Sequence, residues 1–283
     1  MNNKKPNEQI ITPEEAMRKC FVSMSKNCLE LRPKETFNGS LNGKILFFIA
    51  FFINISGLGI VFTPSPYEKP LLPIFLILVS CFLFCMLEWA LVSRITALSN
   101  IVFNRKTKKC YAYYNNKKYI NHVNDVIIYG GAKTMISMHR RDKNGIIITK
   151  NIEIDDEWSI KPISDYIKTF ISHGSNSLII PAEYEWSGLE NIYISFPPCK
   201  SLCHYAPWPF CGRVVDPIEK MLKIYMWPIY TFIMFPINMI FSLLWYPFTK
   251  IFNIRPHPVP EEAYEGDDSI RVTPEMAAKG IRP

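Results

Sequence analysis

The feature that most constrains this chain is the length of its uncharged apolar runs. Residues 45–67 contain 23 consecutive residues without a charge, and a second run begins at Pro70 and stays uncharged until Glu88. A helix of that length extends about 35 Å at roughly 1.5 Å per residue, which is enough to cross a hydrocarbon core of roughly 30 Å. We therefore expect lipid, and not water, to be the solvent of these runs.

A short segment joins the two runs, from Pro64 to Pro73, and it contains four prolines. Proline interrupts helices and suits a tight connection, so the sequence predicts a two-helix transmembrane hairpin over residues 45–93. A cleaved signal peptide is not expected, because 44 largely polar residues precede the first run. A buried pair of helices in a soluble core is the alternative.

Basic residues near the ends of the hairpin predict its orientation. Residues 1–44 contain 8 basic residues, and the chain after the hairpin opens with Arg94, whereas the turn offers only Lys69 beside Glu68. Lys and Arg accumulate on the cytoplasmic side of membrane proteins. We therefore expect a multi-pass protein of the bacterial inner membrane, with its N-terminus and the following domain in the cytoplasm.

A third apolar segment, Ile224 to Thr249, has 26 residues without a charge, but it contains Pro228, Pro236 and Pro247. Proline is tolerated in spanning helices when neighbours satisfy the freed carbonyls, and aromatic residues at both ends of the segment are typical of membrane interfaces. A kinked span, a re-entrant or surface-lying segment, and a soluble core helix all stay open. A span would place the C-terminal tail outside the cytoplasm.

The stretch 94–180 is the part of the chain able to form a water-soluble domain. Six short apolar segments separated by turn residues predict strands, and they are antiparallel because no helix lies between them. A helix from Ser159 to His173, ended by Gly174, would close this small antiparallel sheet or open barrel, an α+β arrangement. The predicted strands are 100–104, 109–114, 117–120, 125–129, 134–139 and 145–154.

The order of these elements resembles a pleckstrin-homology-like domain that follows a membrane hairpin, and a plain antiparallel α+β domain is the competing interpretation. The predicted division of the chain has six parts. These are a cytoplasmic N-terminal segment (1–44), the hairpin (45–93), the basic β domain (94–180), a Pro/Trp/Cys-rich linker (181–220), the third membrane segment (221–252) and an acidic polar tail (253–283).

Positive charge is concentrated in one part of the chain. Residues 94–150 contain 12 basic and 2 acidic residues, a net charge of +10. Anionic lipid is the favoured polyanion, because the basic residues cluster in turns and not on a helix suited to a nucleic-acid groove; solvated turns without a ligand are the alternative. The candidate residues for lipid or partner contact are Arg105, Lys106, Lys108, Lys109, Lys117, Lys118, Arg140 and Arg141.

The cysteines predict no metal site and no cofactor. Eight cysteines in a protein facing the cytoplasm are expected to be reduced. The weak candidate is the cluster Cys199, Cys203, His204 and Cys211, which offers enough ligands for zinc. Its spacing is not C-x2-C, and adjacent Cys203 and His204 would need a sharp turn to share one ion.

No motif for hydrolysis or for phosphate binding is present in the sequence, so an enzyme is not expected. His139, beside two arginines, lies in a predicted strand and is assigned a structural role. Asp155 and Asp156 precede the predicted helix, where they favour its positive end. Glu88 falls near the cytoplasmic end of the second apolar run, within reach of water, so it is not expected to relay protons.

The segment from Phe103 to Tyr111 carries a resemblance. With the preceding hairpin, its pattern F-N-R-x-T-x-K-x-Y is similar to an uncharacterised family of bacterial inner-membrane proteins often encoded beside type VI secretion genes. The resemblance implies an immunity or accessory protein that contacts a toxin or a secretion component. Self-association into a homo-oligomer is a further partner interaction to consider. An anionic-lipid-binding scaffold or sensor and a membrane-permeabilising toxin are the alternatives.

Overall fold

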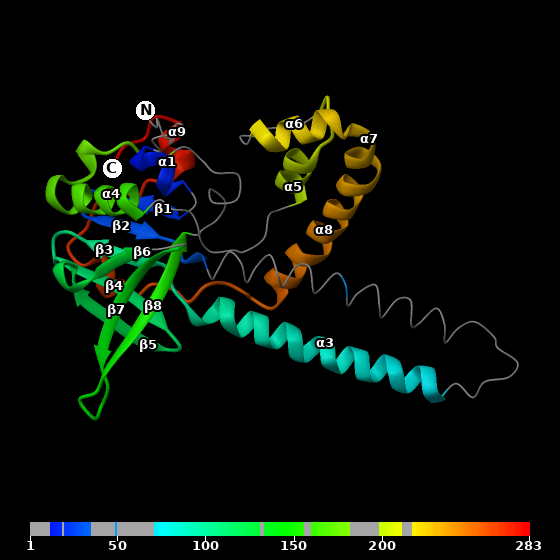
Figure 1. The fold of residues 1–283 in the computed structure, drawn as a ribbon, viewed down its shortest axis with the longest axis horizontal. Coiled ribbons are helices and arrows are strands. Elements are labelled where there is room, and N and C mark those ends of the chain that lie inside the picture. Colours follow the sequence, from blue (N-terminus) through cyan, green and yellow to red (C-terminus); the bar gives the residue numbers. More distant parts are fainter. Residues whose placement is uncertain are drawn as a thin grey trace, which may run out of the picture. The chain divides into compact units, whose positions relative to one another are not determined.

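The computed structural model describes residues 12–18, 20–34, 49, 71–130, 133–155, 160–181, 198–210 and 217–283. The chain divides into two compact units (Figure 1). Unit 1 comprises residues 1–34, 98–191 and 257–283, and unit 2 comprises residues 35–97 and 192–256. Each unit is therefore built from segments that are far apart in the sequence.

Unit 1 is built on two antiparallel sheets. Its strands are β1 (Phe21–Met24), β2 (Cys28–Leu31), β3 (Ile101–Asn104), β4 (Lys109–Tyr114), β5 (Lys117–His122), β6 (Ile127–Gly130), β7 (Thr134–Arg141) and β8 (Ile147–Asp155). Among the described residues, one sheet has the order β1-β2-β3-β4-β5 and the other the order β6-β7-β8. The strands predicted after residue 94 and their antiparallel pairing are thus confirmed.

The N-terminal residues belong to the sheet and are not a separate segment, which corrects the predicted boundary at 94. β2 pairs with β3, with Leu31 opposite Ile101 and Cys28 opposite Asn104. All four residues of β1 and all four of β2 are buried. Strands covered on both faces lack the polar alternation that marks a strand in a sequence, and so this pair was missed.

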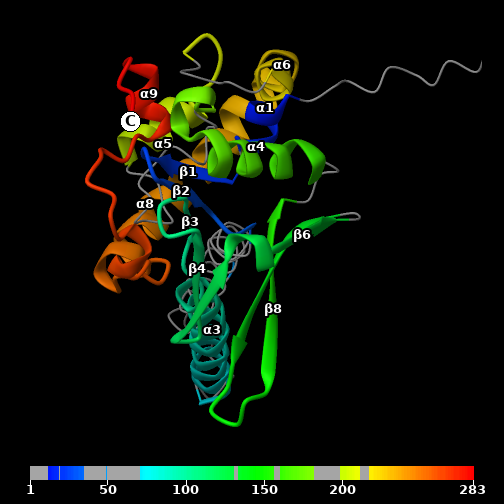
Figure 2. The same ribbon diagram turned by 90° about the vertical axis from the view of Figure 1, so that its left-hand side faces the viewer.

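A helix closes one end of the sheets, as predicted. α4 (Ile160–His173) buries Ile163, Tyr166 and Phe170 in the same core as the strands, and it packs against α1 (Pro13–Met17). It ends at Gly174, whose φ of 85° is a left-handed conformation that glycine adopts without strain. Figure 2 shows α4 lying across the end of both sheets.

The acidic tail is also part of unit 1, which is a second correction. It contains η4 (Glu261–Tyr264) and α9 (Pro274–Ala278), and Val272 forms an antiparallel bridge with Met24 of β1. A second, smaller core lies between sheet and tail, where Ala263 packs with Val102 and Tyr111. The η4 part of the tail therefore covers the face of the sheet opposite the main core, whereas Val272 is buried in the main core itself.

Unit 2 contains the long helix α3 (Leu71–Ala97), 27 residues or about 40 Å in length. Its large apolar side chains are exposed, with Leu78 64%, Phe82 60% and Trp89 74% accessible. The first apolar run lies outside the described residues except for Ile49, so the predicted hairpin partner of α3 has no description here.

The region predicted as a linker contains helices instead. α5 (Pro198–Tyr205) packs against α8 (Phe235–Ile251), and α6 (Pro217–Tyr225), α7 (Trp227–Ile229) and the π-helical turn η3 (Tyr230–Met234) connect them. The wider π turn comes just before Pro236, which lacks the N–H of a regular helix. The stretch Trp227–Ile251 is long and apolar enough to cross a membrane by length and composition.

Candidate functional site

After α3 and again after α8, the chain re-enters unit 1 at the same place. We name this place the anchor point and define it by Leu98, Ser99 and His257. Leu98, the residue after α3, bridges Tyr114 at the end of β4. The His257 N–H donates to the Leu98 carbonyl at 3.2 Å, and the His257 ring stacks on Tyr113 with centroids 4.2 Å apart. The chain segments that follow α3 and α8 therefore enter unit 1 side by side.

A buried carboxylate ties three strands together beside the anchor point. Glu30 of β2 accepts hydrogen bonds from the Ser23 hydroxyl of β1 and from the Asn100 amide before β3, each at 2.8 Å. Burial lowers the pKa of the neighbouring Arg32, and the charge of Glu30 acts in the opposite direction. Because both carboxylate oxygens are engaged, this cluster holds strands and offers no free acid or base.

The predicted basic residues do not form one surface. Arg105 to Lys108 form the turn before β4, whereas Lys117 and Lys118 follow the turn after it, so the six residues of β4 separate the two groups by about 20 Å. The second group is at the anchor end, because Tyr114 bridges Leu98. The first group is at the α4 end, because Arg105 lies against Gly174.

Asn104 fixes the acidic tail to the turn of the F-N-R pattern. Its side-chain amide donates to the carbonyls of Ala263 and Glu265, both at 3.0 Å. Its side-chain oxygen accepts from the backbone amides of Lys106 at 2.9 Å and Thr107 at 3.1 Å. A buried asparagine with four such bonds is fully satisfied, so this side chain acts as a clamp between turn and tail.

Other residues of the pattern complete the same interface. Phe103 is buried in the main core, whereas Tyr111 is buried in the second core against the tail. The two side chains are buried on opposite faces of the sheet, because Phe103 pairs with Cys110, and Tyr111 pairs with Val102, in the β3–β4 register. The pattern therefore builds a platform for the tail.

Two of the predicted lipid-contact lysines are occupied by the tail. Lys118 pairs with Glu262, and this hydrogen-bonded partner raises the pKa of Lys118. The Lys106 ammonium donates to the Gly266 carbonyl at 3.1 Å, and nearby Ser25 donates to Asp267. The acidic tail is thus electrostatically complementary to part of the basic surface.

The remaining predicted cations lie on β7 and in exposed turns. Arg140 pairs with Asp142 at 3.4 Å and its guanidinium lies 5.7 Å from the Tyr119 ring centroid. Arg141, Lys108 and Lys109 are exposed. Sequence reasoning missed two apolar neighbours of Arg141, Ile146 and Ile147, which are 61% and 59% exposed.

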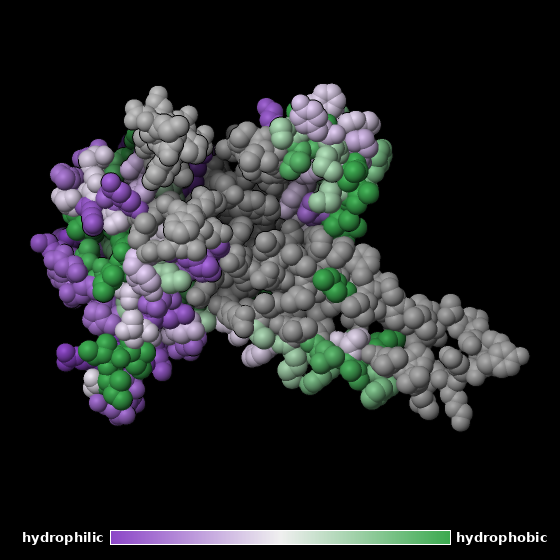
Figure 3. Space-filling view, in the orientation of Figure 1, coloured by the Kyte–Doolittle hydropathy of each residue, from purple (hydrophilic) through white to green (hydrophobic). Residues whose placement is uncertain are grey.

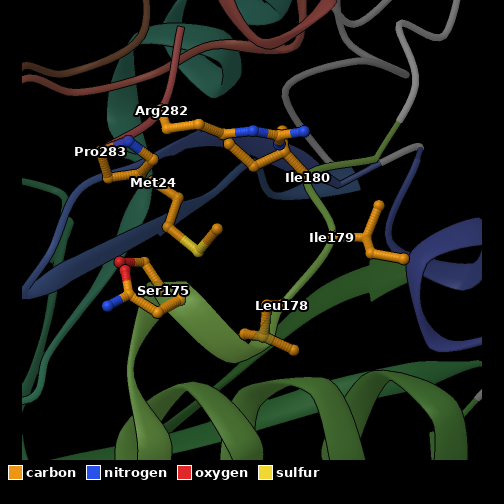
Figure 4. A pocket seen from close by; sticks show the side chains of 8 residues that line it. Met24, Ser175, Leu178, Ile179, Ile180, Arg282 and Pro283 are labelled. Atoms are coloured by element: carbon orange, nitrogen blue, oxygen red, sulfur yellow. The ribbon is translucent and has the colours of Figure 1, made fainter. Parts of the chain in front are cut away.

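A cavity of about 410 Å³ lies between β1, η2 (Ser175–Ser177) and the last residues of the chain (Figure 4). Met24, Leu178 and Ile180 give it an apolar lining, and Arg282 contributes a cation at one side. An apolar group bearing an anion would suit this lining. Sequence analysis did not predict this cavity, because its walls come from three segments that are far apart in the chain.

The weak metal candidate is not assembled among the residues that can be described. Cys199 and Cys203 lie on α5 with exposed thiols, the His204 side chain cannot be described, and Cys211 lies outside the described residues. Within the described ranges, no group of three His, Cys, Asp or Glu side chains is placed to hold a metal ion.

The other thiols and the candidate histidine have structural settings. Burial raises the pKa of Cys28 to about 12 and raises that of Cys110. His139 lies on β7 as predicted, and its backbone N–H donates to Asn121 at 3.1 Å. Asp155 ends β8, whereas Asp156 and the predicted cap Ser159 lie outside the described residues. Comparisons with family models, curated proteins and solved structures find no match to this chain.

Proposed function

We propose that this chain is a non-enzymatic protein of the bacterial inner membrane that is anchored by a helical hairpin and acts through protein–protein contacts of unit 1. The observation that carries the anchoring is the register of Leu31 with Ile101. Residues 32–100 leave and re-enter the sheet at neighbouring positions. A chain segment that crosses a bilayer between those positions must cross it an even number of times, and the exposed apolar surface of α3 supports the return crossing.

The same reasoning supports a location on one side of the membrane for the third apolar segment. Residues 98–181 and residues 257–283 belong to unit 1, so the membrane crossings between 181 and 257 are even in number. The longest uncharged run in residues 182–226 is 201–212, only 12 residues. That is too short for a second span, so we propose that Trp227–Ile251 lies along the lipid surface.

Side-chain exposure on this helix supports its contact with lipid. Ser242, Trp245 and Thr249 follow one another at helical spacing and are buried. Phe232 and Leu243 are 73% and 50% exposed. A helix that buries its polar side chains within unit 2 and exposes apolar ones suits contact with lipid.

Reporter fusions test this topology. A periplasm-dependent phosphatase joined after Thr63 should be active, because that position lies in the hairpin turn. A cytoplasm-dependent fluorescent protein should be fluorescent after Pro283 and also at the N-terminus, because both ends belong to unit 1. An active phosphatase after Pro283 would contradict the proposed topology.

The resemblance of residues 103–111 supports an immunity or accessory role at a type VI secretion locus. The buried polar groups Glu30 and Asn104 hold strands and tail together, which supports a structural and non-catalytic role for both. Producing the protein together with the toxin encoded beside it should restore the growth of a susceptible strain. A deletion of residues 21–31 serves as the misfolded control. Failure of the intact protein to rescue would exclude immunity, and membrane depolarisation by the protein alone would indicate a toxin.

A further inference from the structure

Unit 1 has two chemically different ends. At the α4 end, Gly174 lies against Arg105, and the tail occupies Lys106. At the opposite end, the anchor point joins Tyr114, and the turn between β4 and β5 carries the exposed Lys117. α3 ends at Ala97, directly before Leu98, so the chain enters unit 1 from α3 at this second end.

The β7–β8 hairpin projects at the anchor end. His139 of β7 lies beside Asn121 of β5, and the next residue of β7, Arg140, lies beside Tyr119. β7 therefore runs toward the end of β5 that carries Lys117. The hairpin tip (residues 141–147) continues beyond these contacts. In Figures 1 and 2 the tip lies at the end of unit 1 opposite α4.

A second contact locates the base of this hairpin. The Lys150 ammonium lies 4.1 Å from the centroid of the Tyr114 ring, and Tyr114 is the residue that bridges Leu98. Lys150 faces Met138, three pairs from the last pair of the ladder, Arg141 with Ile147. The β7–β8 ladder therefore continues for three more pairs, about 10 Å along the strands, between Lys150 and the hairpin tip.

The tip combines apolar and cationic side chains. Ile146 and Ile147 are largely exposed, and Arg141 and Lys143 beside them are exposed as well. Figure 3 shows the resulting hydrophobic patch with hydrophilic residues around it. The tight turn is rigid, because the Asp142 N–H donates to the Ile146 carbonyl at 2.8 Å. Two adjacent isoleucines on a rigid basic turn suit a surface in which a layer of anionic groups covers an apolar interior.

We propose that the hairpin tip, with Lys117, binds the anionic headgroups of the bilayer that holds α3 and inserts Ile146 and Ile147 at the interface. The inference rests on the proposed membrane anchoring. Continuity with the anchor point and charge complementarity favour lipid over a soluble acidic partner. The lysines at the α4 end, in contrast, take no part in this contact.

Hydrogen exchange on the full-length protein in nanodiscs tests the proposal. Backbone amides of residues 142–147 should exchange more slowly with phosphatidylglycerol present than in phosphatidylcholine alone, and high salt should remove the difference. Each close Lys or Arg strengthens binding to an anionic surface roughly fivefold. The double variant Arg141→Ala/Lys143→Ala should therefore reduce the slowing on the order of 25-fold, and Ile146→Ser/Ile147→Ser should also reduce it.

The matched control is Lys108→Ala/Lys109→Ala, which removes the same charge from exposed positions at the α4 end. This control should retain the slow exchange. Equal exchange in both lipid mixtures would overturn the proposed lipid contact. A loss of the slow exchange in Lys108→Ala/Lys109→Ala, with slow exchange retained in the tip variants, would overturn it as well. Release of the protein from membranes by alkaline wash would instead contradict the anchoring, so the two failures are distinguishable.

Discussion

Leu31, the last residue of β2, faces Ile101, the first residue of β3, although residues 32–100 separate them along the chain. Both side chains are fully buried in the main core. The apolar region is therefore an insertion between two neighbouring strands of one sheet. Removing the strands before the insertion would leave β3 as an unpaired edge, which is an aggregation site.

The first prediction concerns the minimal folded unit. A protein in which short Gly/Ser linkers replace residues 35–97 and 192–256 should be monodisperse without detergent and unfold cooperatively, because it keeps both cores. Residues 94–180 alone should aggregate, because they lack β1, β2 and the tail. Size-exclusion chromatography and circular dichroism measure both. A cooperative thermal transition in the 94–180 fragment would refute this account of the core.

The second prediction concerns the Asn104 clamp. Asn104→Ala removes four hydrogen bonds and leaves the carbonyls of Ala263 and Glu265 without their donor. We expect a loss of about 2–4 kcal/mol in the free energy of unfolding of the linker protein, with faster proteolysis of the tail. The control Asn144→Ala, at an exposed turn position, should change stability by less than about 0.5 kcal/mol. Equal effects of the two substitutions would contradict the clamp.

The third prediction separates the clamp from the surface ion pair. Lys118 and Glu262 pair on the surface, where solvent screens the interaction. The pKa of Lys118 is raised, so any stabilisation is present below the ordinary lysine pKa and is lost as the ammonium deprotonates at higher pH. Lys118→Ala should leave the unfolding midpoint at neutral pH nearly unchanged. A destabilisation matching that of Asn104→Ala would assign the tail contact to charge.

The fourth prediction concerns two glycines with positive φ. Gly174→Ala and Gly145→Ala both place a Cβ in a left-handed conformation, which costs about 1–3 kcal/mol. A Cβ at Gly174 also collides with the Arg105 guanidinium, whereas Gly145 has open space. Denaturant unfolding should therefore show a larger loss for Gly174→Ala. Adding Arg105→Ala should recover the excess, and failure to do so would place the strain elsewhere.

The fifth prediction concerns thiol reactivity. Cys28 and Cys110 are buried with raised pKa values, so their reactive thiolates are scarce at neutral pH. Cys199 and Cys203 are exposed. Brief maleimide treatment followed by peptide mass spectrometry should modify the exposed pair and spare the buried pair until denaturant is added. Early modification of Cys110 would contradict the described core.

Local features of the sequence predicted much of unit 1. The turns at Asn115–Asn116 and Gly145 use residues that tolerate positive φ, and they separated the strands correctly. The end of α4 at His173 followed from Gly174, the residue that ends the predicted helix. Each of these features depends on residues that are close together in the sequence. It can therefore be predicted without knowing which distant segment packs against it.

The rest depends on partners that are distant in the sequence. β1 and β2 have four residues each, and their pairing with β3 leaves no local pattern. The tail lacks periodicity, because side-chain-to-backbone bonds from Asn104 hold it. The predicted basic residues come from separate turns, and the length of β4 puts Lys106 and Lys117 at opposite ends of unit 1. The proposed lipid contact therefore includes only some of the basic residues that the sequence predicted for lipid binding, Lys117 among them.

The bridge between Met24 and Val272 makes assembly depend on the order of synthesis. The Met24 N–H donates to the Val272 carbonyl at 3.0 Å, and the Val272 N–H donates back at 2.8 Å. β1 leaves the ribosome early, whereas its partner is translated after every apolar helix. Until residue 272 has been synthesised, β1 of a nascent chain therefore keeps an open strand edge, which is a site for pairing with other chains.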